Sequence, residues 1–112
     1  MPQEKMNSKQ AVIALSALAH DSRLAIYRLL IEHSPGELNA GAISKKLRIP
    51  KASLSFHLKE MSYAGLVSRR HDSRFMHYAA VIPAVNDLID YLTGYQAAVA
   101  PAPIASKRDV RI

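Results

Sequence analysis

A helix with one buried face, opened by a proline and closed by a glycine, constrains this chain more than any other feature. Leu54, Leu58 and Met61 recur at the spacing of a single helical stripe. Pro50 fits the first helical position, where its missing N–H costs nothing, and Gly65 ends the helix. A helix that buries only one stripe leaves its opposite face to solvent or to a partner.

The segments on both sides make this helix the centre of a larger motif. A short helix follows the cap residue Asn39 and ends near Leu47, so that the two helices form a helix-turn-helix. Residues 66–70 and 75–81 have the composition of two strands, and residues 71–74 between them predict a hairpin turn.

The remaining elements are helical. Residues 7–19 predict a helix capped by Asn7 or Ser8, and a second helix begins at Asp21 or Ser22 and ends at Ser34-Pro35-Gly36. A last helix begins at Pro83 and weakens at Gly94. The predicted fold class is therefore mostly α with a small β-hairpin, in the order ααααββα. We expect a flexible N-terminus over residues 1–6, one domain over 7–95 and a flexible Ala/Pro-rich basic tail over 96–112.

The net charge of the chain is concentrated on this central motif. Residues 44–74 hold eight Lys and Arg against Glu60 and Asp72, which accounts for the whole net charge of +6. A charge gathered on one motif predicts a polyanionic partner, although a basic solvated surface is the simpler alternative. The basic pI also suits an acidic membrane, but no helix combines a basic face with an aromatic one, so we expect no membrane partner.

The face of the central helix opposite its buried stripe carries groups suited to double-stranded DNA. Small residues let a backbone approach the major groove, hydroxyls donate and accept, and lysines contact guanine or phosphate. The candidate DNA-binding residues on or beside this face are Lys46, Lys51, Ser53, Ser55, Phe56, His57 and Lys59. On the hairpin we select Arg70 and Arg74 for phosphate or minor-groove contact, with Arg69 second.

Two of these residues have alternative interpretations. Phe56 points outward, where it either contacts a thymine methyl group or packs against the hairpin or a neighbouring helix. His57 lies at the edge of the buried stripe, where it either contacts a base or is a core-edge histidine bonded to the backbone.

The composition excludes several function classes. The chain has no cysteine, which removes disulfides, thiolate metal sites and cysteine nucleophiles. Five scattered histidines match no spacing typical of a metal or catalytic site, although His71 and His77 flank the hairpin turn and could approach each other. We therefore expect no enzyme, no metal and no cofactor. An export leader is not apparent, which favours a cytoplasmic location.

The order of elements and the string KASLSFHLKEMSYAGLVSRR resemble the ArsR/SmtB family of winged helix-turn-helix repressors. The family pattern around the second helix of the motif is matched by Ser53, Ser55, His57, Leu58, Met61, Ala64, Gly65, Leu66 and Val67. A second sequence pattern of the family, nearer the N-terminus, is matched by Ala17-Leu18-Ala19, Arg23-Leu24, Ile26-Tyr27 and Leu30. The similarity covers roughly residues 12–93.

The resemblance implies a homodimer, joined through its first and last helices, that binds an imperfect palindromic operator and represses adjacent genes. The nearly all-round apolar first helix agrees with this, because a helix without a polar face is buried on both sides. The candidate dimer-interface residues are Val12, Leu15, Val85, Leu88, Ile89 and Leu92.

The chain departs from the family at its sensing sites. Asn39 and Gly41 stand where the best-known Cys-x-Cys pair would be, so the usual response to arsenite is not expected. Asp87 and Asp90 are present on the last helix, without the histidine and glutamate of a second family site. Asp72-Ser73 replaces the usual glycine of the hairpin turn. The alternatives to a repressor of unknown inducer are a histidine-based Zn/Ni-responsive repressor and a winged-helix protein-interaction module without specific DNA binding.

Overall fold

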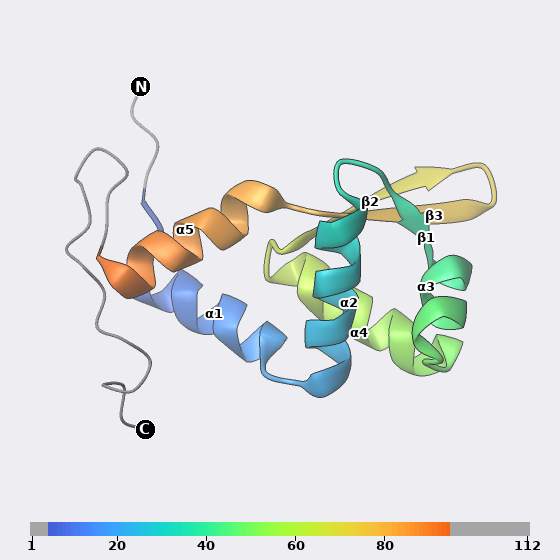
Figure 1. The fold of residues 1–112 in the computed structure, drawn as a ribbon, viewed down its shortest axis with the longest axis horizontal. Coiled ribbons are helices and arrows are strands. Elements are labelled where there is room, and N and C mark those ends of the chain that lie inside the picture. Colours follow the sequence, from blue (N-terminus) through green and yellow to red (C-terminus); the bar gives the residue numbers. More distant parts are fainter. Residues whose placement is uncertain (1–4, 95–112) are drawn as a thin grey trace.

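Five helices and a three-stranded antiparallel sheet form residues 5–94, the part of the chain that a computed structural model describes (Figure 1). In chain order the elements are α1 (Ser8–Leu18), α2 (Asp21–His33), β1 (Leu38–Asn39), α3 (Ala40–Leu47), α4 (Lys51–Tyr63), β2 (Val67–Asp72), β3 (Phe75–Ala80) and α5 (Ile82–Thr93). This confirms the predicted fold class, a winged helix-turn-helix in which α3 and α4 are the paired helices. The tail predicted for residues 96–112 lies outside the described residues.

Hydrogen bonds from nearby side chains determine where α1, α2 and α3 begin. Asn7 caps α1 in a reciprocal capping box with Gln10, and the side chain of Asn39 accepts from the N–H of Ala42, as predicted. The predicted cap of α2 is wrong: His20 takes this place, and its Nδ1 accepts from the N–H of Ser22 at 3.1 Å. Pro50 is likewise the residue before α4 rather than its first residue.

The sheet differs from the predicted hairpin in two ways. Its strand order is β1-β3-β2, and the two-residue strand β1 was not predicted. β2 and β3 pair from Val67↔Ala80 to Asp72↔Phe75, so the predicted turn over residues 71–74 is too long. Ser73 and Arg74 alone form the turn, and Ser73 adopts a positive φ of 53° where glycine is usual. This β2–β3 hairpin is called the wing below.

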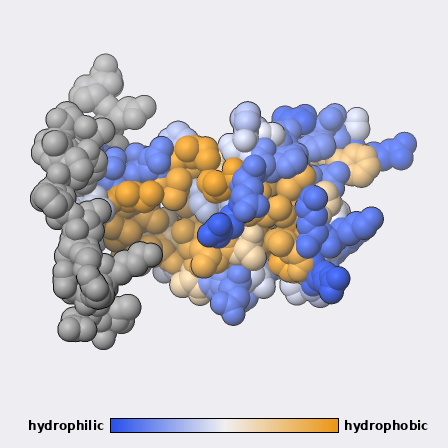
Figure 2. Space-filling model, viewed as in Figure 1, coloured by the Kyte–Doolittle hydropathy of each residue, from blue (hydrophilic) through white to orange (hydrophobic). Residues whose placement is uncertain are grey.

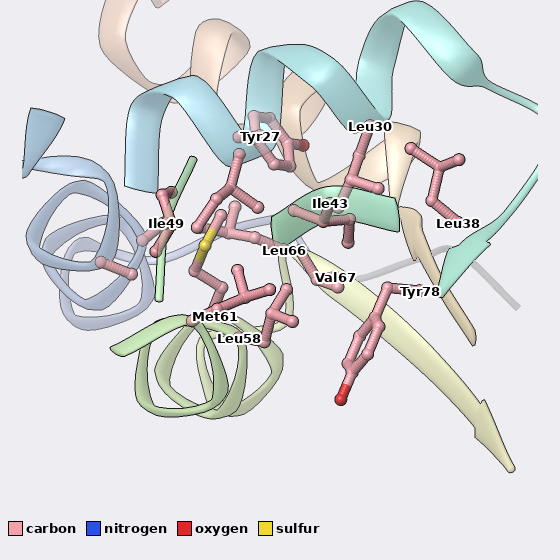
Figure 3. Packing of buried hydrophobic residues seen from close by; sticks show 14 of the residues in the cluster. Tyr27, Leu30, Leu38, Ile43, Ile49, Leu58, Met61, Leu66, Val67 and Tyr78 are labelled. Carbon is pink, nitrogen blue, oxygen red and sulfur yellow. The ribbon is translucent and has the colours of Figure 1, made fainter. Parts of the chain in front are cut away.

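The core lies between α2, α3, α4 and the inner face of the sheet (Figure 3). The predicted buried stripe of α4 is confirmed, because Leu54, Leu58 and Met61 are all essentially inaccessible. Leu30 and Ile43 meet this stripe from α2 and α3. The stripe fixes α4 by its inner face and thereby leaves the opposite face outside.

α1 and α5 pack together at the end of the domain away from the wing (Figure 1). Ala11, Ala14 and Ala17 face inward, whereas the other side of α1 stays exposed. The first helix was predicted to be buried on both sides, and within one chain only one side is. Leu88 was predicted at a dimer interface, but it is 4% exposed in the single chain. We correct that assignment, because Leu88 packs in the chain's own core and leaves almost no surface for a partner.

Within residues 5–94 the helices are too short or too polar for any one of them to cross a lipid bilayer.

Gly65, two residues after the end of α4, has a φ of +80°, a backbone conformation that residues with a side chain rarely adopt. A Cβ there would meet no atom within 4 Å, so replacing Gly65 with alanine tests the backbone alone. We expect the free energy of unfolding to fall by about 1–2 kcal/mol, the cost of a left-handed L-residue, in urea unfolding. The matched control is Gly41→Ala inside α3, where alanine favours the helix and stability should hold or rise.

Candidate nucleic-acid interface

The outer face of α4 is the centre of the candidate interface. Phe56 and Lys59 are exposed on the side opposite the buried stripe, and the exposed residues Lys51, Ser53 and Ser55 flank that side near the start of the helix. Buried leucines thus hold the helix while its short hydroxyl side chains and lysines remain free to approach a groove. The N–H groups of the first turn add partial positive charge at the N-terminal end of α4.

The turn before α4 brings further cations to that end. Lys46 is exposed on α3, and Arg48 ends α3 in a left-handed conformation with φ of 56°. The hydroxyl of Ser44 donates to the carbonyl of Ile49 at 2.6 Å and fixes the turn between the two helices. Lys46 therefore lies one tight turn away from the N-terminus of α4.

The wing carries three exposed arginines, Arg69, Arg70 and Arg74, of which Arg70 is paired with a carboxylate. Arg74 is exposed in the turn of the wing. Arg70, also selected for DNA contact, is held by Glu37, with 2.7 Å between Arg70 Nη2 and Glu37 Oε1. The hydrogen bond from Arg70 lowers the pKa of the Glu37 carboxyl, and Glu37 in turn raises the pKa of Arg70. Arg70 is thus paired with Glu37 while 53% of its side chain stays exposed, and its contact with phosphate stays a prediction.

His57 is not available to contact a base. It is 8% exposed, and its Nδ1 accepts a hydrogen bond from Nε of Arg23 on α2 at 3.0 Å. The core-edge interpretation is the right one, although the partner is a side chain rather than the backbone. Burial, followed by the charges of His20 and Arg23, lowers the pKa of His57 and keeps the ring neutral at pH 7.

Phe56 packs against a neighbouring helix, which was one of its two predicted roles, and its contact with a thymine methyl group stays a prediction. Its side chain contacts a neighbouring helix, since the Arg23 guanidinium carbon lies 5.5 Å from the centroid of its ring. The residue is nevertheless 57% exposed, so much of its surface stays open to a partner. The ring is supported from one side and open on the other.

The histidines of the wing do not approach each other. His71 pairs with Met76 and His77 pairs with Arg70, which puts the two rings on opposite faces of the sheet. Within residues 5–94, no group of three or more His, Asp or Glu side chains lies close enough to hold a metal ion.

Hydrophilic side chains gather at the end of the molecule that holds the wing and α3 (Figure 2). Figure 2 shows hydrophilic side chains around the wing and α3, and an apolar area over α1 and α5. The cations of α3, α4 and the wing thus share one end of the domain. Such an arrangement can follow the phosphates on both sides of a groove.

Removing the carboxylate that holds Arg70 should strengthen binding to any DNA. In a Glu37→Gln variant, Arg70 is expected to reach phosphate and to steepen the slope of log affinity against log salt by about 0.9. Binding to a random duplex at several salt concentrations measures this slope. Asp87→Asn makes the same charge change on α5, away from the basic end, and should leave the slope unchanged. An unchanged slope for Glu37→Gln would show that Arg70 does not reach phosphate even when it is released.

Two residues of this interface were missed by sequence reasoning. Arg23 and Glu37 are 34 and 33 residues from the partners they bind, His57 and Arg70. No local spacing links such pairs. Arg23 was noticed only as part of the family's N-terminal sequence pattern, and that pattern does not indicate that Arg23 contacts His57.

Comparisons with known proteins agree with this geometry. Residues 18–70, which include α2, β1, α3, α4 and the first four residues of β2, match the family described as "Helix-turn-helix domain". The transcriptional activator HlyU of Vibrio cholerae is 33% identical over 86 residues, which cover 77% of each chain. A solved structure of HlyU from Vibrio cholerae superposes with a TM-score of 0.63 at 28% identity, covering 82% of this chain and 100% of that one.

A homodimeric winged helix-turn-helix DNA-binding domain from Mycobacterium bovis has the same fold. Its TM-score is 0.62 at 24% identity, covering 77% of this chain and 79% of that one. The helix-turn-helix match, the relationship to a transcriptional regulator over most of the chain and the exposed basic face of α4 lead to one assignment. The chain belongs to the ArsR/SmtB family of winged helix-turn-helix DNA-binding transcriptional regulators.

Proposed function

We propose that the chain acts as a homodimeric repressor that binds an imperfect palindromic operator in double-stranded DNA. The observation that carries this proposal is the exposed face of α4, which presents hydroxyls, an aromatic ring and lysines on a helix fixed by a fully buried stripe. Two such helices related by a two-fold axis reach successive major grooves about 34 Å apart.

The homodimer is supported by the apolar surface of α1 and α5. Val12 and Leu92 are each 58% exposed, and Leu15 and Ile89 are 41% and 50% exposed. These four side chains come from two helices that pack together, α1 and α5. A contiguous apolar surface of this kind typically marks a protein interface. Val85, which is half-buried, lies at its edge; Leu88 is excluded for the reason given above.

The base-reading role is proposed for Lys51, Ser53, Ser55 and Phe56. The serine hydroxyls suit either donors or acceptors of a base edge, and the outward part of the Phe56 ring suits a thymine methyl group. Lys46, Lys59 and Arg74 are proposed to bind phosphate, since all three are exposed and cationic.

Substitutions on α4 should separate these two roles. We expect Ser55→Ala or Phe56→Ala to cost about 1–3 kcal/mol on the operator and little on random DNA, because base contacts are lost. Lys59→Ala should weaken both duplexes about equally and flatten the salt slope by about one unit. The operator is first selected from a randomised duplex pool, and affinities are then measured by fluorescence anisotropy. Equal losses on both duplexes for Ser55→Ala and Phe56→Ala would disprove the base-reading assignment.

Repression is the proposed direction of regulation, in which the bound dimer covers promoter DNA. The relative HlyU is named an activator, so the direction needs its own test. A reporter gene placed behind the selected operator should be less active when the chain is expressed. Higher reporter activity would instead assign activation, with the DNA-binding mode unchanged.

A further inference from the structure

Arg23 connects the DNA-reading helix to α2 through two contacts. Its Nε donates to Nδ1 of His57 at 3.0 Å, and its guanidinium carbon lies 5.5 Å from the centroid of the Phe56 ring. His57 is buried, whereas Phe56 is largely exposed. One α2 side chain thus contacts two successive residues of α4, of which one is in the core and the other faces outward.

This connection depends on the protonation state of His57. A neutral ring accepts the bond from Arg23 at Nδ1, but a protonated ring has no acceptor and repels the guanidinium. The charged or titratable groups that act on His57 are His20, from the turn before α2, and Arg23 itself. The rings of His20 and His57 lie with centroids 4.6 Å apart. His20 uses its own Nδ1 to cap α2, so both histidines are held in place by hydrogen bonds.

We propose that Arg23 is a positioning residue for operator recognition, which holds Phe56 at the base-reading face of α4 only while His57 is neutral. This inference rests on the proposed base-reading role of α4. Since Arg23 also supports the ring of Phe56, protonation of His57 removes that support. The protein is therefore expected to lose preference for its operator in acid, whereas binding to random DNA, which depends on phosphate contacts, does not fall.

The direction of the pH effect follows from the surroundings of His57. Burial, His20 and Arg23 all lower its pKa, so the ring is neutral above the ordinary histidine value of about 6.5. The bond from Arg23 is therefore fully present above that value. It is lost as the pH falls through the lowered pKa of the folded protein.

The test measures the ratio of operator affinity to random-duplex affinity between pH 8 and pH 5. For the wild-type chain we expect this ratio to fall in acid, by at most about tenfold per pH unit, which is the limit for one proton. His57→Gln keeps an acceptor for Arg23 but does not titrate, so its ratio should stay constant. His33→Gln, which removes an exposed histidine at the end of α2, should retain the wild-type pH dependence.

Arg23→Lys distinguishes positioning from direct phosphate contact. Lysine keeps the charge but lacks the planar guanidinium that serves both contacts, so operator affinity should fall about tenfold while random-duplex affinity stays within about twofold. Unfolding midpoints of each variant show whether the domain remains folded at each pH. A wild-type ratio independent of pH, a His57→Gln variant that keeps the acid loss, or wild-type operator affinity in Arg23→Lys would overturn the proposal.

Failure of this inference can be told from failure of the proposed function. If Phe56→Ala at pH 8 weakens operator and random DNA equally, base reading itself is wrong. If Phe56→Ala weakens the operator alone but the ratio is independent of pH, only the role of Arg23 and His57 is wrong.

Discussion

Replacing Leu92 with glutamate is expected to produce a monomer and to weaken operator binding by about 10²- to 10⁴-fold. Leu92 is 58% exposed on α5 beside the apolar side of α1, and a buried carboxylate there would be costly for a partner to cover. The large loss arises because a dimer binds two half-sites at once, whereas a monomer binds only one. In the dimer, binding at one half-site raises the effective concentration of the second subunit at the other half-site, and a monomer lacks this gain. Val12→Glu on α1 should have the same effect.

Light scattering gives the mass of each variant, and fluorescence anisotropy gives its operator affinity. The matched control is Ala25→Glu, which adds the same negative charge at an exposed position of α2. That variant should keep the mass of a dimer and most of its affinity. If Leu92→Glu also kept the mass and affinity of the wild-type chain, the α1–α5 surface would not be the dimer interface.

The second large effect is expected in the core beneath α4. Leu58 is 1% exposed in α4, and Leu58→Ala should lower the free energy of unfolding by about 2–5 kcal/mol, since it leaves a cavity among well-packed neighbours. A loss of this size is a large part of the stability of a small domain.

Urea unfolding at one fixed protein concentration measures this loss, because the stability of a dimer depends on concentration. The adjacent control, Lys59→Ala, is exposed and should change stability by no more than about 0.5 kcal/mol. A loss below about 1 kcal/mol for Leu58→Ala would mean that the stripe of α4 does not anchor the helix.

Local patterns were sufficient to predict the helices and the exposed face of α4. Leu54, Leu58 and Met61 set the orientation of that helix, and everything opposite them was placed outside correctly. The caps Asn7 and Asn39 were also readable, since a capping side chain bonds within three residues of itself.

Features that depend on contacts distant in the sequence could not be predicted. β1 has two residues and exists through its pairing of Leu38 with Tyr78, 40 positions away. The pairing of Arg70 with Glu37 and the burial of His57 under Arg23 likewise join separate elements. Of the residues selected for DNA binding, these contacts bury His57 and pair Arg70 with a carboxylate. The extent of the wing turn was misjudged because Ser73 adopts the left-handed conformation that sequence reasoning reserves for glycine.

Fluorescence anisotropy of the selected operator duplex in excess random DNA tests the central claim most directly. At about 150 mM salt, a sequence-specific regulator of this kind should prefer its operator by about 10³-fold or more. Binding that survives the random competitor is the predicted result. Binding that the competitor removes completely would contradict sequence-specific recognition and would leave α4 as a surface for non-specific contact with phosphate.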